Sequence, residues 1–283
     1  MKKLLLIILC FCLCGCHMIS TDKKAKIKEE YIPKRVISIK KNTVKQISVY
    51  INKQKIYGEA YIPKTEKTVP VVILCHGYGG NYRNLSVLAD YLMEHQIAAY
   101  TFDFRGGSPI NKSDGFMRDM SVSTEIEDLQ AVIEKIKTLN FIDNSKIYLG
   151  GHSQGGLVAS LTAAKRNDIK GLFLGAPAYN IPMLCRFSPV PEKGQAISFL
   201  KGKIGRRYII DGRKYLMYRD IMDYKGHVTI FHGSKDTVVP LSYSLQAKKA
   251  YSDIKVHIIR NAGHLFTKNM QIQMGEYLIK SIK

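Results

Sequence analysis

Apolar residues recur along the chain in short runs of two kinds. From residue 36 to residue 62 apolar and polar residues alternate, most clearly in 46–51 and 56–62, and this pattern predicts two or three antiparallel strands. Residues 71–75 form a continuous apolar run instead, which is typical of a parallel strand covered by helices on both faces. Further strands are predicted at 98–102, 147–149, 171–174, 228–231 and 256–259.

Helical patterns alternate with these predicted strands. The clearest covers about residues 121–139, where apolar residues follow one another at three- and four-residue steps with charged residues between them. A second helical run follows at 157–161. Because strands and helices alternate, the chain is predicted to fold as an α/β protein, with a mostly parallel, doubly wound sheet and antiparallel strands at its N-terminal side.

The alternation stops between residue 178 and about residue 225. Pro182, Pro189 and Pro191 interrupt the early part of this segment, and basic residues are frequent in it. We therefore expect an inserted cap here rather than sheet elements. The basic residues are Arg186, Lys193, Lys201, Lys203, Arg206, Arg207, Arg213 and Lys214.

The N-terminus has the pattern of a bacterial export signal. Two lysines precede an apolar run at residues 4–13, which is too short for a membrane span of about 20 residues but suits the core of a signal peptide over residues 1–15. The sequence Leu-Cys-Gly-Cys that ends at Cys16 resembles a lipobox, so we expect Cys16 to be diacylated and to anchor the protein to the outer face of the cell membrane. Plain secretion is the alternative. Residues 16–34 are polar and rich in lysine, which predicts a tether ahead of a folded domain at 35–283.

Composition narrows the class of protein. With 283 residues, of which 46% are hydrophobic, the chain can bury one large core or at most two domains. The net charge of +20 attracts anionic surfaces, but no recognition helix, zinc-binding spacing or RNA-binding aromatic motif accompanies it, so no nucleic-acid partner is expected. Only Cys75 and Cys185 lie beyond the N-terminal cysteines, which argues against a disulfide framework. No metal-binding motif or dinucleotide fingerprint is present, so no metal and no cofactor are expected.

A candidate nucleophile lies between a predicted strand and a predicted helix, in the segment Gly151-His152-Ser153-Gln154-Gly155. Glycines two residues away on each side allow Ser153 to occupy a sharp turn that exposes its hydroxyl. At the start of a helix this oxygen lies beside unpaired backbone N–H groups and the positive end of the helix dipole, which favour developing negative charge. We therefore predict that Ser153 is a catalytic nucleophile.

A serine hydroxyl is a weak nucleophile until a base takes its proton, and that base needs a carboxylate to orient it. Downstream of Ser153, His264 follows the predicted strand 256–259 in a loop that can bend back over the sheet, which makes it the best candidate base. Asp236 lies in the loop directly after the predicted strand 228–231 and is the best candidate carboxylate. The other nearby aspartates, Asp211, Asp220 and Asp223, lie in the predicted cap.

Acyl transfer also builds an oxyanion, which requires two positioned hydrogen-bond donors. The backbone N–H of Gln154, directly after the nucleophile, is the first candidate. The second is the backbone N–H of Tyr78, in the glycine-rich loop that follows the strand 71–75. The sequence contains no metal-binding motif, so we do not expect a metal ion to stabilise the oxyanion.

Several motifs, spread over nearly the whole mature chain, together resemble the α/β-hydrolase superfamily. In that superfamily the nucleophile, acid and base come in the order Ser, Asp, His along the chain. The motifs are His76-Gly77, the segments 103–108, 151–156 and 232–240, and Gly263-His264. More narrowly, residues 114–116, 120–122 and 125–128 with 151–156 resemble bacterial feruloyl and cinnamoyl esterases. This resemblance implies a small cap over the site and cleavage of carboxylic esters of hydroxycinnamic acids.

The sequence thus predicts a surface-anchored serine esterase that cleaves a small-molecule carboxylic ester through an acyl-enzyme. Ser153 is the expected nucleophile, His264 the base and Asp236 the orienting carboxylate. A dipeptidyl or amino peptidase on the same fold is one alternative. A non-catalytic surface lipoprotein that binds a ligand or partner through its basic cap is the other.

Overall fold

The computed structural model describes residues 37–199 and 202–282. The predicted signal peptide, Cys16 and the whole predicted tether therefore lie outside the described residues. Within the described ranges, no helix combines the length and the apolar character needed to cross a membrane.

An eight-stranded sheet forms the centre of the fold, in the order β1-β4-β6-β5-β7-β8-β11-β12. β4 pairs antiparallel with both β1 and β6, and every pairing from β6 to β12 is parallel. This confirms the predicted mostly parallel sheet with antiparallel N-terminal strands. The strands are β1 (Thr43–Gln46), β4 (Gly58–Ile62), β5 (Val69–Cys75), β6 (Ala98–Phe102), β7 (Ile142–His152), β8 (Ile169–Gly175), β11 (His227–Gly233) and β12 (Ile254–Ile259).

The N-terminal alternating runs divide differently from the prediction. The run at 46–51 contains the end of β1 and then β2 (Val49–Ile51), and the run at 56–62 contains the end of β3 (Gln54–Ile56) and then β4. β2 and β3 pair with each other as a separate hairpin, whose two turn residues, Asn52 and Lys53, have φ values of 49° and 68°. Positive φ at both turn positions suits the twist of a two-residue hairpin, so the chain leaves the large sheet here and returns to it at β4.

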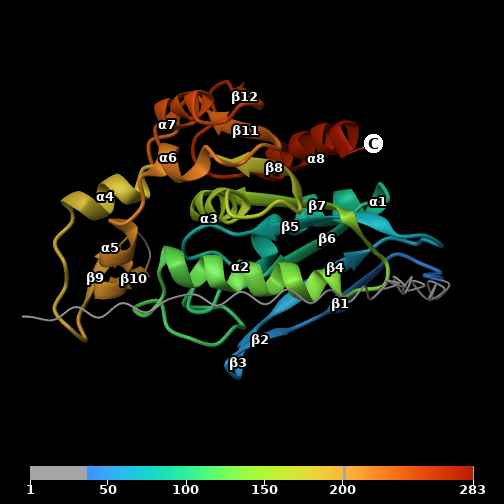
Figure 1. Cartoon of the computed structure of the whole chain (residues 1–283), viewed down its shortest axis with the longest axis horizontal. Helices are drawn as coiled ribbons and strands as arrows, with labels where there is room; N and C mark the ends of the chain where they lie inside the picture. The colour runs from blue at the N-terminus through green and yellow to red at the C-terminus, as the bar shows by residue number, and fades with distance from the viewer. Residues whose placement is uncertain (1–36, 200–201, 283) are drawn as a thin grey trace, which may run out of the picture. The chain divides into compact units, whose positions relative to one another are not determined.

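Helices cover both faces of the sheet (Figure 1). α1 (Ser86–Glu94) and α8 (Lys268–Ile282) pack on one face, where Leu88 and Leu278 join Leu74 of β5 in one apolar cluster. α2 (Val122–Lys137) and α3 (Gln154–Ala163) pack on the other face, against Ile73 of the same strand. Successive side chains of β5 thus point into two buried layers, which explains its continuous apolar run.

The predicted helix at 121–139 is α2, which begins and ends within two residues of the expected bounds. Ser121 caps its N-terminus, because its hydroxyl accepts a hydrogen bond from the Thr124 N–H while the Thr124 hydroxyl accepts one from the Ser121 N–H. Shorter helical elements are η1 (Tyr82–Leu85), α7 (Leu241–Gln246) and η2 (Ala247–Lys249).

Between β8 and β11 lies the segment for which the sequence predicts a cap, called the cap segment below (residues 178–225). It forms α4 (Ile181–Phe187), β9 (Ala196–Phe199), β10 (Gly202–Gly205), α5 (Arg206–Gly212) and α6 (Met217–Ile221). The expectation that it contains no sheet element is wrong, because β9 and β10 pair as an antiparallel hairpin. Ile204 and Tyr208 of this segment are buried in the same apolar cluster as α2 and α3, which ties it to the sheet domain.

Candidate active site

Ser153 lies in a strained turn between β7 and α3. Its φ of 54° and ψ of −122° belong to a region that residues other than glycine rarely adopt. A Cβ at Gly155 would overlap the carbonyl oxygens of Cys75 and His76, and one at Gly151 would overlap the backbone of Gly155. The two glycines are therefore required by close backbone approach, as the sequence pattern predicts.

The structure brings Ser153, His264 and Asp236 together in one hydrogen-bonded chain. The Ser153 hydroxyl donates to His264 Nε2 over 2.9 Å, and His264 Nδ1 donates to Asp236 Oδ2 over 2.7 Å. The side chain of His264 is 15% exposed, whereas the carboxylate of Asp236 is fully buried. The three side chains come from loops after β7, β11 and β12, which are neighbouring or near-neighbouring strands of the sheet.

Asp236 is held in its charged form by its surroundings. Burial alone would raise its pKa, but hydrogen bonds from His232 and His264 and from the Val239 backbone outweigh burial and lower the pKa below its usual value. Oδ1 also accepts the N–H groups of Val238 and Val239, each over 2.9 Å. The carboxylate is therefore both ionised and fixed in orientation toward His264.

His232 is a supporting residue that sequence reasoning missed. It is fully buried, with Nε2 3.2 Å from Asp236 Oδ2 and 2.9 Å from the Val239 carbonyl, and Nδ1 2.7 Å from the Ser244 hydroxyl. Nε2 is thus the protonated nitrogen, and the Ser244 hydroxyl donates to Nδ1. The sequence signal was its place at the end of a buried strand, four residues before Asp236.

The two predicted oxyanion donors belong to residues close to Ser153: Gln154 follows it in the chain, and Tyr78 follows Gly77, which packs against it. Gly77 packs against it so closely that a Cβ there would lie 3.1 Å from Ser153 Cβ, and Tyr78 follows directly. Within the described part of the chain, neither the Tyr78 N–H nor the Gln154 N–H has a hydrogen-bond acceptor. Both amides are therefore available to a ligand at Ser153.

The loop that carries Tyr78 is fixed by the buried side chain of His76. Its Nδ1 donates to the Gly77 carbonyl over 2.8 Å, and its Nε2 accepts the Phe104 N–H over 3.2 Å. Burial lowers the pKa of His76, which favours the neutral ring that these two bonds require. The glycine-rich loop is thus held beside Ser153 by a ring with a defined tautomer.

A model of a hydrolase family described as serine aminopeptidase, S33, matches residues 66–220, which is more than half of the chain. The chain belongs to this hydrolase family. The predicted resemblance to α/β-hydrolases of the feruloyl esterase type is confirmed as well. The solved structure of Est1E from Butyrivibrio proteoclasticus with ferulic acid bound superposes with a TM-score of 0.76 at 26% identity, over 83% of this chain and 99% of that one.

Curated relatives match shorter parts of the chain. The quorum-quenching protein AidA of Acinetobacter baumannii is 29% identical over 128 residues, which are 44% of this chain and 41% of AidA. Esterase FrsA of Vibrio vulnificus is 27% identical over 145 residues, which are 50% of this chain and 33% of FrsA. The chain therefore spans less than half the length of these two relatives.

The cap segment of this family member contacts the residue next to Ser153. The Tyr208 hydroxyl donates to Oε1 of the Gln154 side chain over 2.6 Å, and both residues are buried, each 1% exposed. Tyr78 packs edge-to-face against Phe199 of β9, with ring centroids 5.1 Å apart. Both proposed oxyanion residues are thus in contact with the cap segment through their side chains.

Glu125 lies beside this contact and is also a residue that sequence reasoning missed. It is 1% exposed, and its Oε2 has no hydrogen-bond partner within the described residues. Burial raises its pKa to about 8, and the neighbouring Gln154 amide offsets only part of that shift. The available signal was a carboxylate on the buried side of α2, three residues after Val122 and four before Leu129.

His152, inside the motif itself, supports the loop of His264. Its Nε2 donates to the His264 carbonyl over 2.9 Å, and its ring stacks on Phe266 with centroids 5.5 Å apart. Burial first, and then the nearby His264, lower the pKa of His152 to about 4, so its ring is neutral at neutral pH. Across residues 37–199 and 202–282, no group of three or more histidine, cysteine, aspartate or glutamate side chains is placed to hold a metal ion.

Proposed function

We propose that the protein is a serine hydrolase that cleaves carboxylic esters through an acyl-enzyme. The observation that carries this proposal is the chain of hydrogen bonds from Ser153 through His264 to Asp236, of 2.9 and 2.7 Å, at a strained strand-to-helix turn. Nucleophile, base and orienting carboxylate in hydrogen-bond contact are what acyl transfer by serine requires.

In the proposed reaction the Ser153 oxygen attacks the ester carbonyl while His264 Nε2 takes its proton. The imidazolium then gives that proton to the leaving alkoxide, so that the alcohol departs and an ester to Ser153 remains. A water molecule then gives a proton to the same nitrogen and attacks the acyl-enzyme carbonyl. The imidazolium returns this proton to the Ser153 oxygen as the carboxylic acid is released. Asp236 stays ionised throughout and stabilises the charged ring.

The backbone N–H groups of Tyr78 and Gln154 are proposed to bind the oxyanion of each tetrahedral intermediate. Donors of this kind stabilise the transition state by roughly 3 kcal/mol each. Their lack of acceptors within the described residues and their position beside Ser153 support this role. The cap segment is proposed to cover the acyl group, because Tyr208 and Phe199 pack directly on the residues that supply these donors.

The substrate class rests on the relatives. FrsA is named an esterase, and Est1E was solved with ferulic acid bound. We therefore propose carboxylic esters with an aromatic acyl group of the hydroxycinnamoyl type as substrates. A peptidase activity is the second candidate, because the family that includes this chain is described as serine aminopeptidase.

Comparing ester and amide turnover tests the proposal. The full-length protein and its Ser153→Ala variant are assayed with p-nitrophenyl and methyl hydroxycinnamate esters and with aminoacyl and dipeptidyl p-nitroanilides. We expect ester hydrolysis that the variant loses by a factor of roughly 10⁴ to 10⁶. Amide cleavage in preference to ester cleavage would establish the peptidase instead, and equal ester rates for both proteins would refute the proposed nucleophile.

The location of the protein is a separate proposal that rests on the sequence. We propose export and lipid anchoring through Cys16, which puts the enzyme on the outer face of the cell membrane. Membrane and soluble fractions of cells expressing the protein or its Cys16→Ala variant test this. Anchoring predicts that the variant leaves the membrane fraction, and an unchanged distribution would contradict it.

A further inference from the structure

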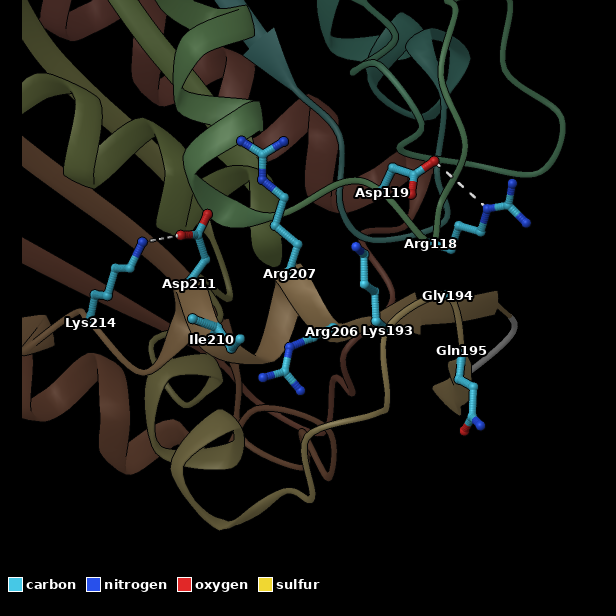
Figure 2. A pocket seen from close by; sticks show the side chains of 10 residues that line it. All are labelled: Arg118, Asp119, Lys193, Gly194, Gln195, Arg206, Arg207, Ile210, Asp211 and Lys214. Atoms are coloured by element: carbon cyan, nitrogen blue, oxygen red, sulfur yellow. Dashed lines mark hydrogen bonds and ion pairs between the residues drawn. The ribbon is translucent and has the colours of Figure 1, made fainter.

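The cap segment and the loop before α2 together line a cavity of about 700 Å³, to which none of Ser153, Asp236 and His264 contributes. Figure 2 shows that the basic side chains lining it come from three parts of the chain: Arg118 from the loop before α2, Lys193 from the loop before β9, and Arg206 and Arg207 from α5. Lys214 lies two residues after the end of α5. The cavity thus gathers charges that are distant in the sequence.

Backbone contacts hold these segments in place. A Cβ at Gly205 would overlap the carbonyl oxygen of Arg118, so the start of α5 lies directly against the Arg118 backbone. Asp211, at the other end of α5, is 5% exposed and accepts the hydroxyl of Ser121 over 2.5 Å. Helix α5 is therefore fixed at both ends to the loop that carries Arg118.

The carboxylates of the cavity do not balance its basic groups. Five basic residues face two acidic ones, Asp119 and Asp211, which leaves three positive charges uncompensated. Asp211 is already paired with Lys214 over 2.7 Å and with the Ser121 hydroxyl, and Asp119 lies 3.7 Å from Arg118.

The remaining basic groups keep most of their hydrogen-bond donors. Arg206 gives one N–H group to the Pro191 carbonyl over 3.2 Å. Neither Lys193 nor Arg207 has a hydrogen-bond acceptor or an ion-pair partner within the residues that the structure describes. Lys193, Arg206 and Arg207 are therefore the groups that can bind a ligand.

We propose that this cavity is a binding site for a multiply charged anion of the phosphate class, either an organic phosphate or a run of phosphodiesters. Arginine binds phosphate through two parallel N–H donors, and lysine adds a point charge. A single carboxylate would neutralise only one of the three free charges, whereas a phosphate dianion neutralises two and a polyphosphate all three. A volume of about 700 Å³ also lies in the range of small-molecule sites.

The site is separate from the proposed ester site, although α5 adjoins both. Arg207 faces the cavity, and the next residue, Tyr208, is buried and hydrogen-bonded to Gln154. Neighbouring residues of α5 thus serve the two sites: Arg207 lines the cavity, and Tyr208 contacts the residue next to Ser153. The proposal requires no catalytic activity and does not rest on the proposed function.

Calorimetric titration of the full-length protein, in a neutral detergent, tests the site. The probes are inorganic tripolyphosphate, glycerol 1-phosphate as a soluble form of a lipid or polymer headgroup, and citrate as a carboxylate of comparable charge. The Lys193→Gln/Arg207→Gln double variant removes two exposed cations that have no partner within the described residues. Lys248→Gln/Lys249→Gln removes the same charge from exposed positions on η2 and serves as the matched control.

We expect saturable one-to-one binding of tripolyphosphate that weakens by roughly tenfold or more in the Lys193/Arg207 variant and less than about twofold in the control. If glycerol 1-phosphate also binds, the site accepts a single phosphate ester of the kind found in a headgroup or a small organic phosphate. If only tripolyphosphate binds, the site requires several linked phosphates. Equal weakening in both variants, citrate binding as tight as tripolyphosphate binding, or no saturation would each overturn the proposal.

Discussion

Removing the Tyr208 hydroxyl tests whether the cap segment helps to position the proposed oxyanion donors. In Tyr208→Phe the ring stays in place, but Gln154 Oε1 loses its 2.6 Å hydrogen bond in a buried position. An unsatisfied buried acceptor costs about 1–3 kcal/mol of folding stability. Because Gln154 also supplies a proposed oxyanion N–H, we expect part of this loss to appear in the reaction barrier.

A loss of about 1.4 kcal/mol in the barrier would lower kcat roughly tenfold. Urea unfolding measures the stability, and steady-state hydrolysis of a p-nitrophenyl ester gives kcat and KM separately. Tyr224→Phe is the matched control, because it removes another buried hydroxyl that donates to a backbone carbonyl, that of Ile169, over 3.2 Å. We expect the control to lose stability with kcat unchanged.

The reasoning would be refuted if both variants lost similar stability and kept the same kcat. The Tyr208–Gln154 bond would then hold the cap segment in place without acting on the reaction. A change in KM alone would point to substrate binding under the cap segment rather than to the oxyanion site.

Three further substitutions extend these expectations. Asp236→Asn should lower kcat by roughly 10⁴, because a neutral amide no longer fixes His264 in the required tautomer, and rapid ester assays with a circular dichroism control check this. Gly155→Ala should destabilise the fold by about 1–3 kcal/mol or more and abolish activity, because the new methyl group overlaps the Cys75 and His76 carbonyl oxygens. Thermal unfolding measures the effect, and an unchanged Tm would contradict this prediction. Glu125→Gln should change the pH dependence of stability: the carboxyl has a raised pKa of about 8, so the folded state binds its proton more tightly than the unfolded state, and wild-type stability falls as pH rises from about 4.5 to about 8. The glutamine variant lacks that fall, so its stability relative to wild type should improve by up to a few kcal/mol between pH 5 and 8 in urea titrations, and a constant difference would show that the group titrates normally.

The positions of the site residues could be predicted because the chemistry sits at strand ends. Ser153, Asp236 and His264 each follow a strand whose apolar run is visible in the sequence, and strands of a parallel sheet deliver their ends to one edge. The paired glycines around Ser153 indicated the strained turn directly. Short sequence patterns were thus enough to predict features that depend only on neighbouring residues, such as the turn at Ser153 and the ends of the strands.

Contacts between distant segments could not be predicted in the same way. Tyr208 and Gln154 lie 54 residues apart, and nothing in either neighbourhood shows that the two side chains meet. The β9–β10 hairpin was not predicted, because the prolines and basic residues that precede and surround it are not typical of strands. The split between β1 and β2 was missed because the apolar alternation continues through residues 47–48, while the chain leaves the sheet there to form a hairpin.

Covalent labelling of Ser153 tests the central claim most directly. The full-length protein is treated with a fluorophosphonate, and intact mass and peptide mapping locate the adduct. The account predicts a single adduct on the peptide that contains Ser153, and no adduct in Ser153→Ala. An unlabelled wild-type protein, or an adduct that persists in the variant, would contradict the activation of Ser153 by His264 and Asp236.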